Sequence, residues 1–356
     1  MKYIHFLIAL PMVCLMACSS HDDIDETIDN SNPKTKGKPL LIEVTETPMT
    51  DPETANANMG IPGSFRAPIV TKSTLSEFNI NGHWNTGNYS TESVVTYSVT
   101  EEGWMTDLQW PLDVISEETP VKFYAYASVN KNDTQFLYNA NNVNRPPYNP
   151  FLYFMVDENA EEQKDLLVAT QTARPIDNKV HFHFTHPCAA LQFAICKTKA
   201  LTNFSIQVES VILHNIYSSG FYYFDTDSWE VDTEEQPSYF TLLEYPSNSQ
   251  GMRVNTEVSS TDRTNSTFLG NGDDDYLFFI PQTITGWSGG SVANTDGAYI
   301  EIRCSITKGN KNYAEDGAVY IPFSAVLEKG FIHRFNIRMG TSLRNAEGLT
   351  INFRDQ

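Results

Sequence analysis

Almost every apolar segment of the chain repeats with a period of two residues, which is the side-chain period of a β-strand. In the first of these segments Leu40, Ile42 and Val44 fall on one face. Runs of this kind occupy residues 39–47, 121–129, 180–186, 191–196, 204–216, 276–284, 298–306 and 331–339. Clusters of Asn, Asp, Gly, Ser and Pro separate the runs and are typical of turns. Because long amphipathic helical patterns and strand–helix–strand alternation are both missing, the sequence predicts an all-β fold of antiparallel β-sandwiches.

The first residues have the layout of a secretory signal. Lys2 precedes an apolar run over residues 4–17, which is too short to span a bilayer as a helix. Residues 15–18 resemble the lipobox of bacterial lipoproteins, so Cys18 is the predicted lipidation site; an ordinary signal cleavage near this cysteine is the alternative. The polar, acidic run at residues 19–23 resembles the tag that directs lipoproteins of Bacteroidota to the outer face of the outer membrane. We therefore expect a lipid anchor and a surface-exposed outer-membrane location.

The length of the chain predicts two folded domains. About 320 residues follow the N-terminal region, and domains commonly have about 100 to 200 residues. We expect a signal peptide at 1–17, a flexible acidic tether at 18–37, an N-terminal β-sandwich at 38–178 and a C-terminal β-sandwich at 179–356.

The charge of the chain limits its partners. With 24 basic and 44 acidic residues, the formal net charge is −20. Phosphate backbones are bound by basic surfaces, so the composition argues against a nucleic-acid partner.

A search for catalytic or metal-binding motifs yields little. His181, His183, His186 and Cys188 form a string of zinc-type ligands, but His186 has the opposite strand parity from the first two histidines, so the set does not converge on an unbent strand. Two acidic stretches, at residues 225–232 and 271–275, lack the spacing of calcium loops and read as solvated turns. No motif of an activated nucleophile or a phosphate-binding loop occurs. We expect no enzymatic activity, no cofactor and no metal; a glycosidase with two carboxylates is a much weaker alternative.

The cysteines and the aromatic residues allow more than one interpretation. Cys188, Cys196 and Cys304 form an odd set, for which buried free thiols are favoured and a pairing with Cys304 stays open. Aromatic residues make up 12% of the chain, and the stretches 144–154 and 220–224 are expected to present tyrosines on turns. Such tyrosines could stack on sugar rings or pack in a core or an interface.

Six blocks of the sequence together resemble a known family. They are residues 65–80, 110–128, 163–170, 179–195, 277–287 and 328–339. In their order and spacing, and with a lipobox before them, they are similar to the fimbrillin family of Bacteroidales, the subunits of type V pili. The likeness covers nearly the whole chain after the signal. It implies two transthyretin-like, Greek-key β-sandwich domains, a structural rather than catalytic role, and other pilus subunits as partners.

The resemblance also implies a processing step. Fimbrillins are exported as lipoproteins and then cut after an arginine by a trypsin-like protease, which removes the lipidated peptide together with the first strand. Arg66 and Ala67 stand where this site falls, after the strand at residues 39–47; an ordinary surface arginine is the alternative. A sandwich that has lost a strand has an open edge that a strand of another chain can fill.

The last residues have the pattern of such a donor strand. Leu349, Ile351 and Phe353 share one face, although pairing within their own domain is an equal alternative. The sequence therefore predicts a pilus subunit or accessory adhesin that binds a host or bacterial surface ligand. A surface glycan-binding lipoprotein that stays anchored, with Tyr222 and Tyr223 stacking on sugars, is the alternative function.

Overall fold

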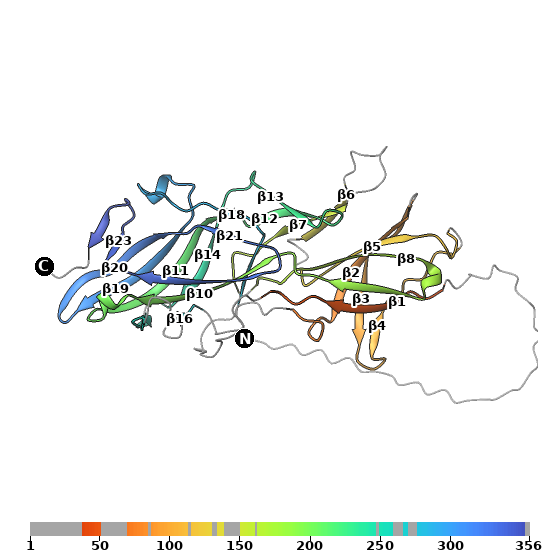
Figure 1. Ribbon diagram of the computed structural model, residues 1–356, viewed down its shortest axis with the longest axis horizontal. Helices are drawn as coiled ribbons and strands as arrows, with labels where there is room; N and C mark the ends of the chain where they lie inside the picture. Colours follow the sequence, from red (N-terminus) through yellow and green to blue (C-terminus); the bar gives the residue numbers. More distant parts are fainter. Residues whose placement is uncertain are drawn as a thin grey trace, which may run out of the picture. The chain divides into compact units, whose positions relative to one another are not determined.

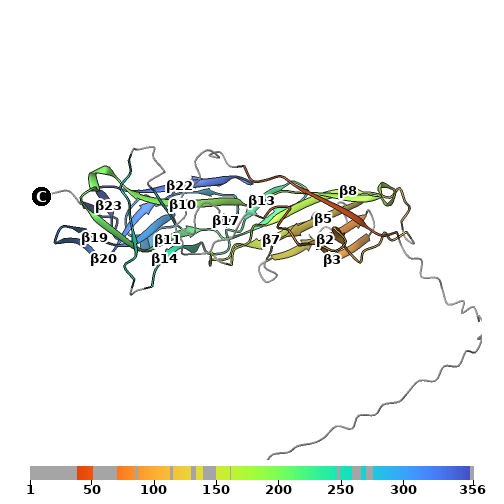
Figure 2. The same ribbon diagram turned by 90° about the horizontal axis from the view of Figure 1, so that it is seen from below.

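The fold is all-β, as the sequence predicts. The structure, a computed structural model, describes residues 38–50, 70–84, 87–112, 115–129, 134–138, 150–160, 162–246, 249–258, 266–269 and 276–352. In these residues the helical elements are the 3-10 turns η2 (Pro175–Asp177), η3 (Lys199–Leu201) and η4 (Val292–Asn294). None of the helices in the described ranges is long and apolar enough to cross a membrane. Figure 1 shows the strands from one side and Figure 2 from below.

The first sheet contains seven strands in the order β8-β5-β2-β3-β4-β1-β9. Their bounds are β8 Leu167–Ala173, β5 Val121–Ala127, β2 Glu77–Trp84, β3 Gly87–Ser98, β4 Gly103–Met105, β1 Leu41–Glu46 and β9 Lys179–Phe184. The two ends of this order meet, because Val168 of β8 and Thr185 after β9 exchange backbone hydrogen bonds of 3.0 and 2.9 Å. The sheet thus wraps around one apolar cluster. The fully buried members of this cluster are Phe78, Ile80, Val95, Trp110, Val121, Phe123, Ala125, Ala127, Leu167, Val180, Phe182 and Phe184.

The remaining strands form four sheets around a second, larger cluster. The largest has the order β14-β11-β19-β20-β23-β24, with β15 beside β11. The bounds are β14 Ser238–Glu244, β11 Ser205–Ile216, β19 Tyr299–Lys308, β20 Lys311–Pro322, β23 Ser342–Arg344, β24 Thr350–Asn352 and β15 Met252–Arg253. A second has the order β16-β10-β17, with β22 beside β10. The bounds are β16 Thr267–Phe268, β10 Ala189–Lys197, β17 Leu277–Phe279 and β22 Ile332–Met339. A third has the order β13-β12-β7-β6. The bounds are β13 Ser228–Val231, β12 Ser219–Tyr223, β7 Pro150–Met155 and β6 Thr134–Tyr138. The last pairs β18 (Thr283–Ile284) with β21 (Ala325–Val326).

Strand β5 is buried on both faces, which its alternating pattern does not predict. Phe123 and Ala125 point into the first cluster, whereas Tyr124 and Tyr126 belong to the second cluster. The expected outward face of this strand is therefore an interior face. One strand thus contributes to both apolar clusters.

Two pairs of strands are parallel within otherwise antiparallel sheets. They are β1 with β9 and β10 with β22. Parallel neighbours need a long connection between them, and here the intervening strands supply it. Antiparallel pairing, which the sequence predicts, holds for every other pair of the strands named above.

The predicted boundary between two domains lies at residue 179, the first residue of β9. Strand β9 belongs to the first sheet, while β6 and β7, from before the boundary, pair with β12 and β13. Residues 37–356 form one compact unit. The division at residue 179 stays a prediction.

Candidate functional site: the groove filled by strand β1

Strand β1 lies between β4 and β9, and its two neighbours hold it to different extents. It pairs in parallel with β9 at six positions, from Leu41 opposite Lys179 to Glu46 opposite Phe184. On its other side it pairs with β4 at one position, Ile42 opposite Trp104. Most of the β-ladder that holds β1 is therefore on β9. The sequence folds in this way because alternating side chains give β1 one apolar face to bury.

The inward face of β1 fills the first apolar cluster. Leu40, Ile42 and Val44 are all buried there, as the alternation predicts. The chain then continues into the second cluster, where Met49 is buried. The N–H of Thr50 donates a 2.7 Å hydrogen bond to Gly330, next to β22. The segment from residue 40 to residue 50 thus contributes apolar side chains to both clusters.

The outward face of β1 is held by a row of polar side chains on β9. Lys179 forms an ion pair with Glu43, and Nδ1 of His181 lies 2.9 Å from the other carboxylate oxygen of Glu43. The hydrogen bond from Lys179 holds the pKa of the Glu43 carboxyl below its usual value. His183 contacts the hydroxyls of Thr45 and Thr47, which come from β1 and the residues after it.

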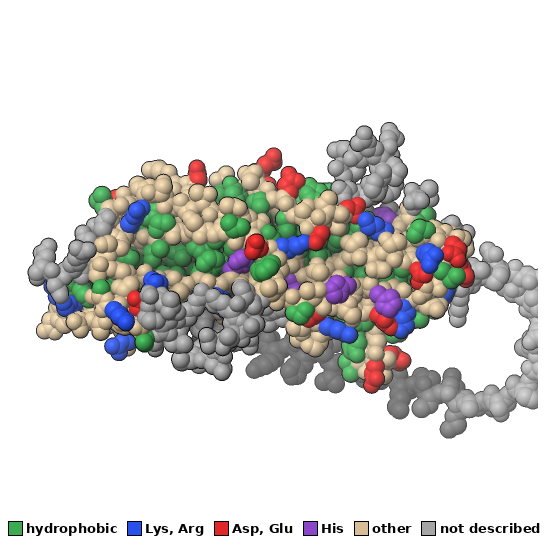
Figure 3. Space-filling model, viewed as in Figure 1, with side chains coloured by type: hydrophobic (Ala, Val, Ile, Leu, Met, Phe, Trp, Pro, Cys, Tyr) green, Lys and Arg blue, Asp and Glu red, His purple; other side chains and the backbone are tan. Residues whose placement is uncertain are grey.

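The distances from these two hydroxyl oxygens to the ring nitrogens of His183 are 2.9 and 2.6 Å. Figure 3 shows histidine side chains on the surface over β1, beside acidic and basic side chains. We call Lys179, His181 and His183 the β9 polar row. Its members are exposed, so each contact is expected to be weak, and the row acts on register more than on stability.

A buried pair of side chains, Asp165 and His186, holds the backbone at Val70. The N–H of Val70 donates a 2.7 Å hydrogen bond to Asp165. Nδ1 of His186 lies 3.1 and 3.0 Å from the two carboxylate oxygens of Asp165, and both side chains are almost fully buried. Burial raises the pKa of the Asp165 carboxyl above its ordinary value, against the effect of these hydrogen bonds. The backbone is therefore held by hydrogen bonds at Thr50 and at Val70, the described residues on either side of residues 51–69.

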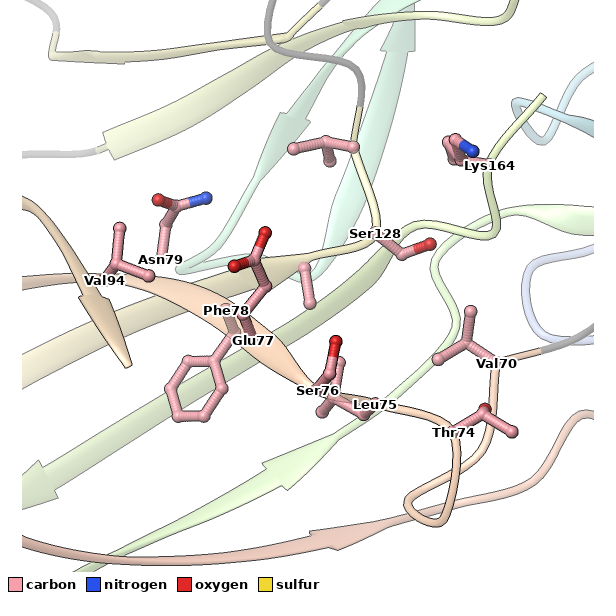
Figure 4. A pocket seen from close by; sticks show the side chains of 12 residues that line it. Val70, Thr74, Leu75, Ser76, Glu77, Phe78, Asn79, Val94, Ser128 and Lys164 are labelled. Atoms are coloured by element: carbon pink, nitrogen blue, oxygen red, sulfur yellow. The ribbon is translucent and has the colours of Figure 1, made fainter. Parts of the chain in front are cut away.

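A cavity of about 280 Å³ lies beside Val70. Figure 4 shows Glu77 and Asn79 of β2, Ser128 after β5, and Lys164 at its wall. The lining mixes these polar groups with apolar side chains, and no site residue predicted from the sequence contributes to it.

Several predicted site residues lie outside the described residues. They are Cys18, Arg66, Ala67 and Phe353. Their roles in lipidation, processing and strand donation stay predictions.

The other predicted donor residues can be placed. Leu349 is 64% exposed, and Ile351 lies in β24 opposite Leu343 of β23. Strand β23 itself pairs with β20 through Tyr320 and Arg344. The stretch before residue 349 therefore contains a strand of the largest sheet. The donor role stays a prediction.

The histidines and cysteines occupy separate environments. His181 and His183 face β1, whereas His186 points into the interior against Asp165. Within the described ranges, no three His, Cys, Asp or Glu side chains are arranged to hold a metal ion. Cys188, Cys196 and Cys304 are free and buried, as the odd number indicates.

Sequence reasoning missed the β9 polar row and Asp165. Residues 179–183 alternate Lys, His and His with apolar residues, and this alternation was the available signal for the row. Asp165 had no comparable signal, because it meets His186 across 21 positions of sequence and Val70 across 95.

Comparison with known proteins identifies the family. A family model described as fimbrillin-like matches residues 71–353. None of the curated proteins compared with the chain matches it.

Solved structures show the fold. A fimbrial protein from Bacteroides vulgatus is 17% identical, with 78% of this chain and 95% of that chain covered and a TM-score of 0.50. A candidate cell adhesion protein from Bacteroides ovatus is 11% identical, with coverages of 90% and 99% and a TM-score of 0.45. With the family match extending over most of its length, this chain is a member of the fimbrillin-like family.

Proposed function

We propose that the protein is a subunit or accessory adhesin of a cell-surface fimbria in which β1 is a removable strand. Family membership supports a fimbrial or adhesive, non-enzymatic role at the cell surface. The position of β1 is the observation that supports its role as a removable strand. It fills a groove between β4 and β9, and it lies before residues 51–69, where the predicted processing site Arg66–Ala67 falls. A cut there would separate β1 from the rest of the fold.

Loss of β1 would leave a groove that favours a new strand. Each buried side chain of the size of Leu40, Ile42 or Val44 contributes about 1.5 to 3 kcal/mol to binding in the groove. The backbone of β9 would also lose its partners over six positions, and such an unpaired edge is a template for another strand. The empty groove is therefore a binding site for an extended, alternating peptide.

Residues 349–353 have the pattern that such a groove requires. Leu349, Ile351 and Phe353 have the same spacing as Leu40, Ile42 and Val44. In this structure the segment is lightly held: β24 is three residues long and pairs with β23 alone among the described strands. We propose that this segment of one subunit fills the β1 groove of the next, and that other pilus subunits are accordingly the partners.

The anchor and the protease complete the proposal. A lipid on Cys18 would hold the precursor at the outer membrane, and a trypsin-like protease that cuts after Arg66 would release the remainder of the chain. Mass spectrometry of the protein taken from native cell surfaces tests this step. A chain that starts at Ala67 supports it, and a diacylated Cys18 on every molecule would refute it.

Strand exchange is tested on the folded full chain after limited trypsin digestion. The expected first cut is after Arg66, because the Pro/Gly/Asn-rich sequence around it is typical of an exposed loop. A fluorescent peptide of residues 345–356 should then bind the cut chain and should not bind the uncut chain. A peptide carrying Ile351→Asp is the matched control. Equal binding of both peptides, or first cuts inside the described strands, would contradict the proposal.

A further inference from the structure

The outer face of the sheet β13-β12-β7-β6 carries aromatic side chains where polar ones are the norm. An antiparallel sheet that covers a core usually has an apolar inner face and a polar outer face. Here Leu152, Phe154 and Tyr222 point inward into the second cluster. Four of their neighbours in the same two strands point outward and are aromatic as well.

Four aromatic rings form a contiguous patch on this outer face. The ring of Phe221 lies 5.8 Å from that of Phe151 and 5.2 Å from that of Tyr153, between ring centroids. The rings of Phe151 and Tyr223 are 5.6 Å apart. All four side chains are half-buried, and none belongs to either buried cluster. We call Phe151, Tyr153, Phe221 and Tyr223 the aromatic patch; β12 and β7, which carry it, lie side by side in Figure 1.

The strand register arranges the patch in two rows, one of which has a polar side chain at both ends. One row runs across the four strands as Gln135, Tyr153, Phe221 and Glu230. The next row runs as Leu137, Phe151, Tyr223 and Ser228. The hydroxyl of Tyr223 donates a 2.8 Å hydrogen bond to Glu230. Glu230 is the one charged outward side chain that the described parts of these four strands contribute.

These stretches correct two expectations from the sequence. Residues 150–155 and 219–223 form adjacent strands rather than turns. Tyr222, expected to stack on sugars, is buried, and its hydroxyl donates a 2.6 Å hydrogen bond to Asp227. Tyr223 faces outward. The outward residues are therefore the ones available to a ligand.

We propose that the aromatic patch binds a neutral oligosaccharide. The C–H faces of sugar rings would stack on the four aromatic rings, and sugar hydroxyls would hydrogen-bond to Gln135, to Glu230 and to the tyrosine hydroxyls. Neighbouring strands are about 4.8 Å apart, so the two rings of one row are spaced on the scale of adjacent sugar units.

The size of the patch favours a small ligand over a protein. An aromatic side chain has about 150 to 250 Å² of surface, so four half-buried rings present about 300 to 500 Å². A stable protein interface buries about 800 Å² on each partner, which is about twice that area. The patch is therefore too small for a second copy of the chain or for another folded partner.

The charge of the patch favours a neutral ligand over an anionic one. Glu230 is acidic, and the outward positions of these four strands that the structure describes contribute neither lysine nor arginine. The chain as a whole has a formal charge of −20. Sulfated or sialylated glycans would therefore be repelled by Glu230, with no lysine or arginine among the described outward positions of these strands to offset it.

Binding is tested on the uncut, monomeric full chain, so the result does not depend on strand exchange. A printed array of neutral and anionic oligosaccharides is probed, and the strongest neutral one is titrated by calorimetry. Removing the aromatic face by Tyr153→Leu or Phe221→Leu should weaken binding about two- to tenfold, because stacking on an aromatic face contributes about 0.5 to 1.5 kcal/mol beyond the area that it buries. Leucine keeps the position apolar, so a contact that needs only hydrophobic bulk would survive these substitutions.

The matched control is Tyr239→Leu, at a tyrosine that is 55% exposed in β14 of another sheet. It should leave binding unchanged, and thermal unfolding should show that all three variants are folded. The proposal is overturned if the neutral glycans fail to bind or if anionic glycans bind best. It is also overturned if leucine at positions 153 and 221 preserves binding, or if the patch variants alter self-association rather than glycan binding.

Discussion

Two adjacent leucines at the start of β1 provide a direct test of how the groove holds this strand. Leu40 immediately precedes the strand and points inward, with 4% of its surface exposed, whereas Leu41 points outward and is 50% exposed. The two substitutions Leu40→Ala and Leu41→Ala remove the same atoms from neighbouring positions. Differences in chain entropy, expression and backbone propensity are thus nearly cancelled.

The burial of the two residues predicts different losses of stability. Replacing a buried leucine by alanine costs about 2 to 5 kcal/mol, and the lower half of that range applies here because the segment lies at an end of the cluster and can relax. At an exposed position the same change costs less than about 0.5 kcal/mol. For a unit of this size, about 2 to 3 kcal/mol corresponds to a fall in Tm of about 4 to 6 °C.

The free energy of unfolding is measured by urea titration with tryptophan fluorescence, since Trp104 and Trp110 pack in or against the first cluster. After the chain is cut, Leu40→Ala should also accelerate release of the β1 peptide by a factor that matches its loss of stability. Equal effects of the two substitutions would show that β1 does not bury this face. The proposal that another strand binds in the groove left by β1 would then fail as well.

Three further predictions concern other contacts. His186→Ala should cost about 3 to 5 kcal/mol because the buried Asp165 carboxyl loses its imidazole partner and keeps the N–H of Val70. His181→Ala, at an exposed histidine of β9, should cost less than about 1 kcal/mol, and similar values from urea titration would contradict this. The His214 ring, whose Nε2 lies 3.2 Å from the Glu301 carboxylate, and the hydrogen bond from Arg303 hold the pKa of Glu301 below its ordinary value. Its contribution to stability is therefore present above about pH 4.3 and is lost as the pH falls further. Glu301→Gln should therefore flatten the decline in Tm below that pH, and an unchanged acid slope would count against it. Deleting residues 349–356 should change the Tm little and abolish polymer formation, whereas a deletion from residue 341 would also remove Leu343, which is buried in the second cluster.

The strands with one buried face are the part of the fold that the sequence predicts well. In β1 and β9 the period of two is visible because one face meets the core and the other meets solvent or polar side chains. The alternation in β5 is equally clear, yet it does not reveal that Tyr124 and Tyr126 are also buried. Tyrosine suits either environment, so the pattern of a single strand cannot report what covers its second face.

The aromatic strands β7 and β12 were missed as strands for a related reason. Both of their faces are aromatic, so the alternation of polar and apolar residues is lost. Pro and Asn before β7 and Gly220 within β12 add the composition of turns. Pairing of β1 with β9 was also beyond reach, because a strand's periodicity indicates its faces but not its neighbours.

One last prediction concerns the β9 polar row. It tests the register in which the donor strand, residues 349–353, would enter the β1 groove under the proposed function. An uncut β1 is tethered to its groove at a high effective concentration, so a donor strand competes only after the cut. If Leu349 takes the place of Leu40, then Asn352 falls where Glu43 now meets Lys179 and His181.

If the donor is shifted by two residues, Thr350 falls at that place instead. A peptide of residues 345–356 with Asn352→Glu should therefore bind the cut chain up to about fivefold more tightly in the first register, since an exposed ion pair contributes about 0.2 to 1 kcal/mol. A peptide with Thr350→Glu should show that gain only in the second register. Fluorescence anisotropy at low and high salt measures both peptides, and the gain should shrink as salt screens the charges. Because a strand in either register places one of these positions opposite the β9 polar row, a gain from neither peptide would mean that the segment does not enter the β1 groove parallel to β9.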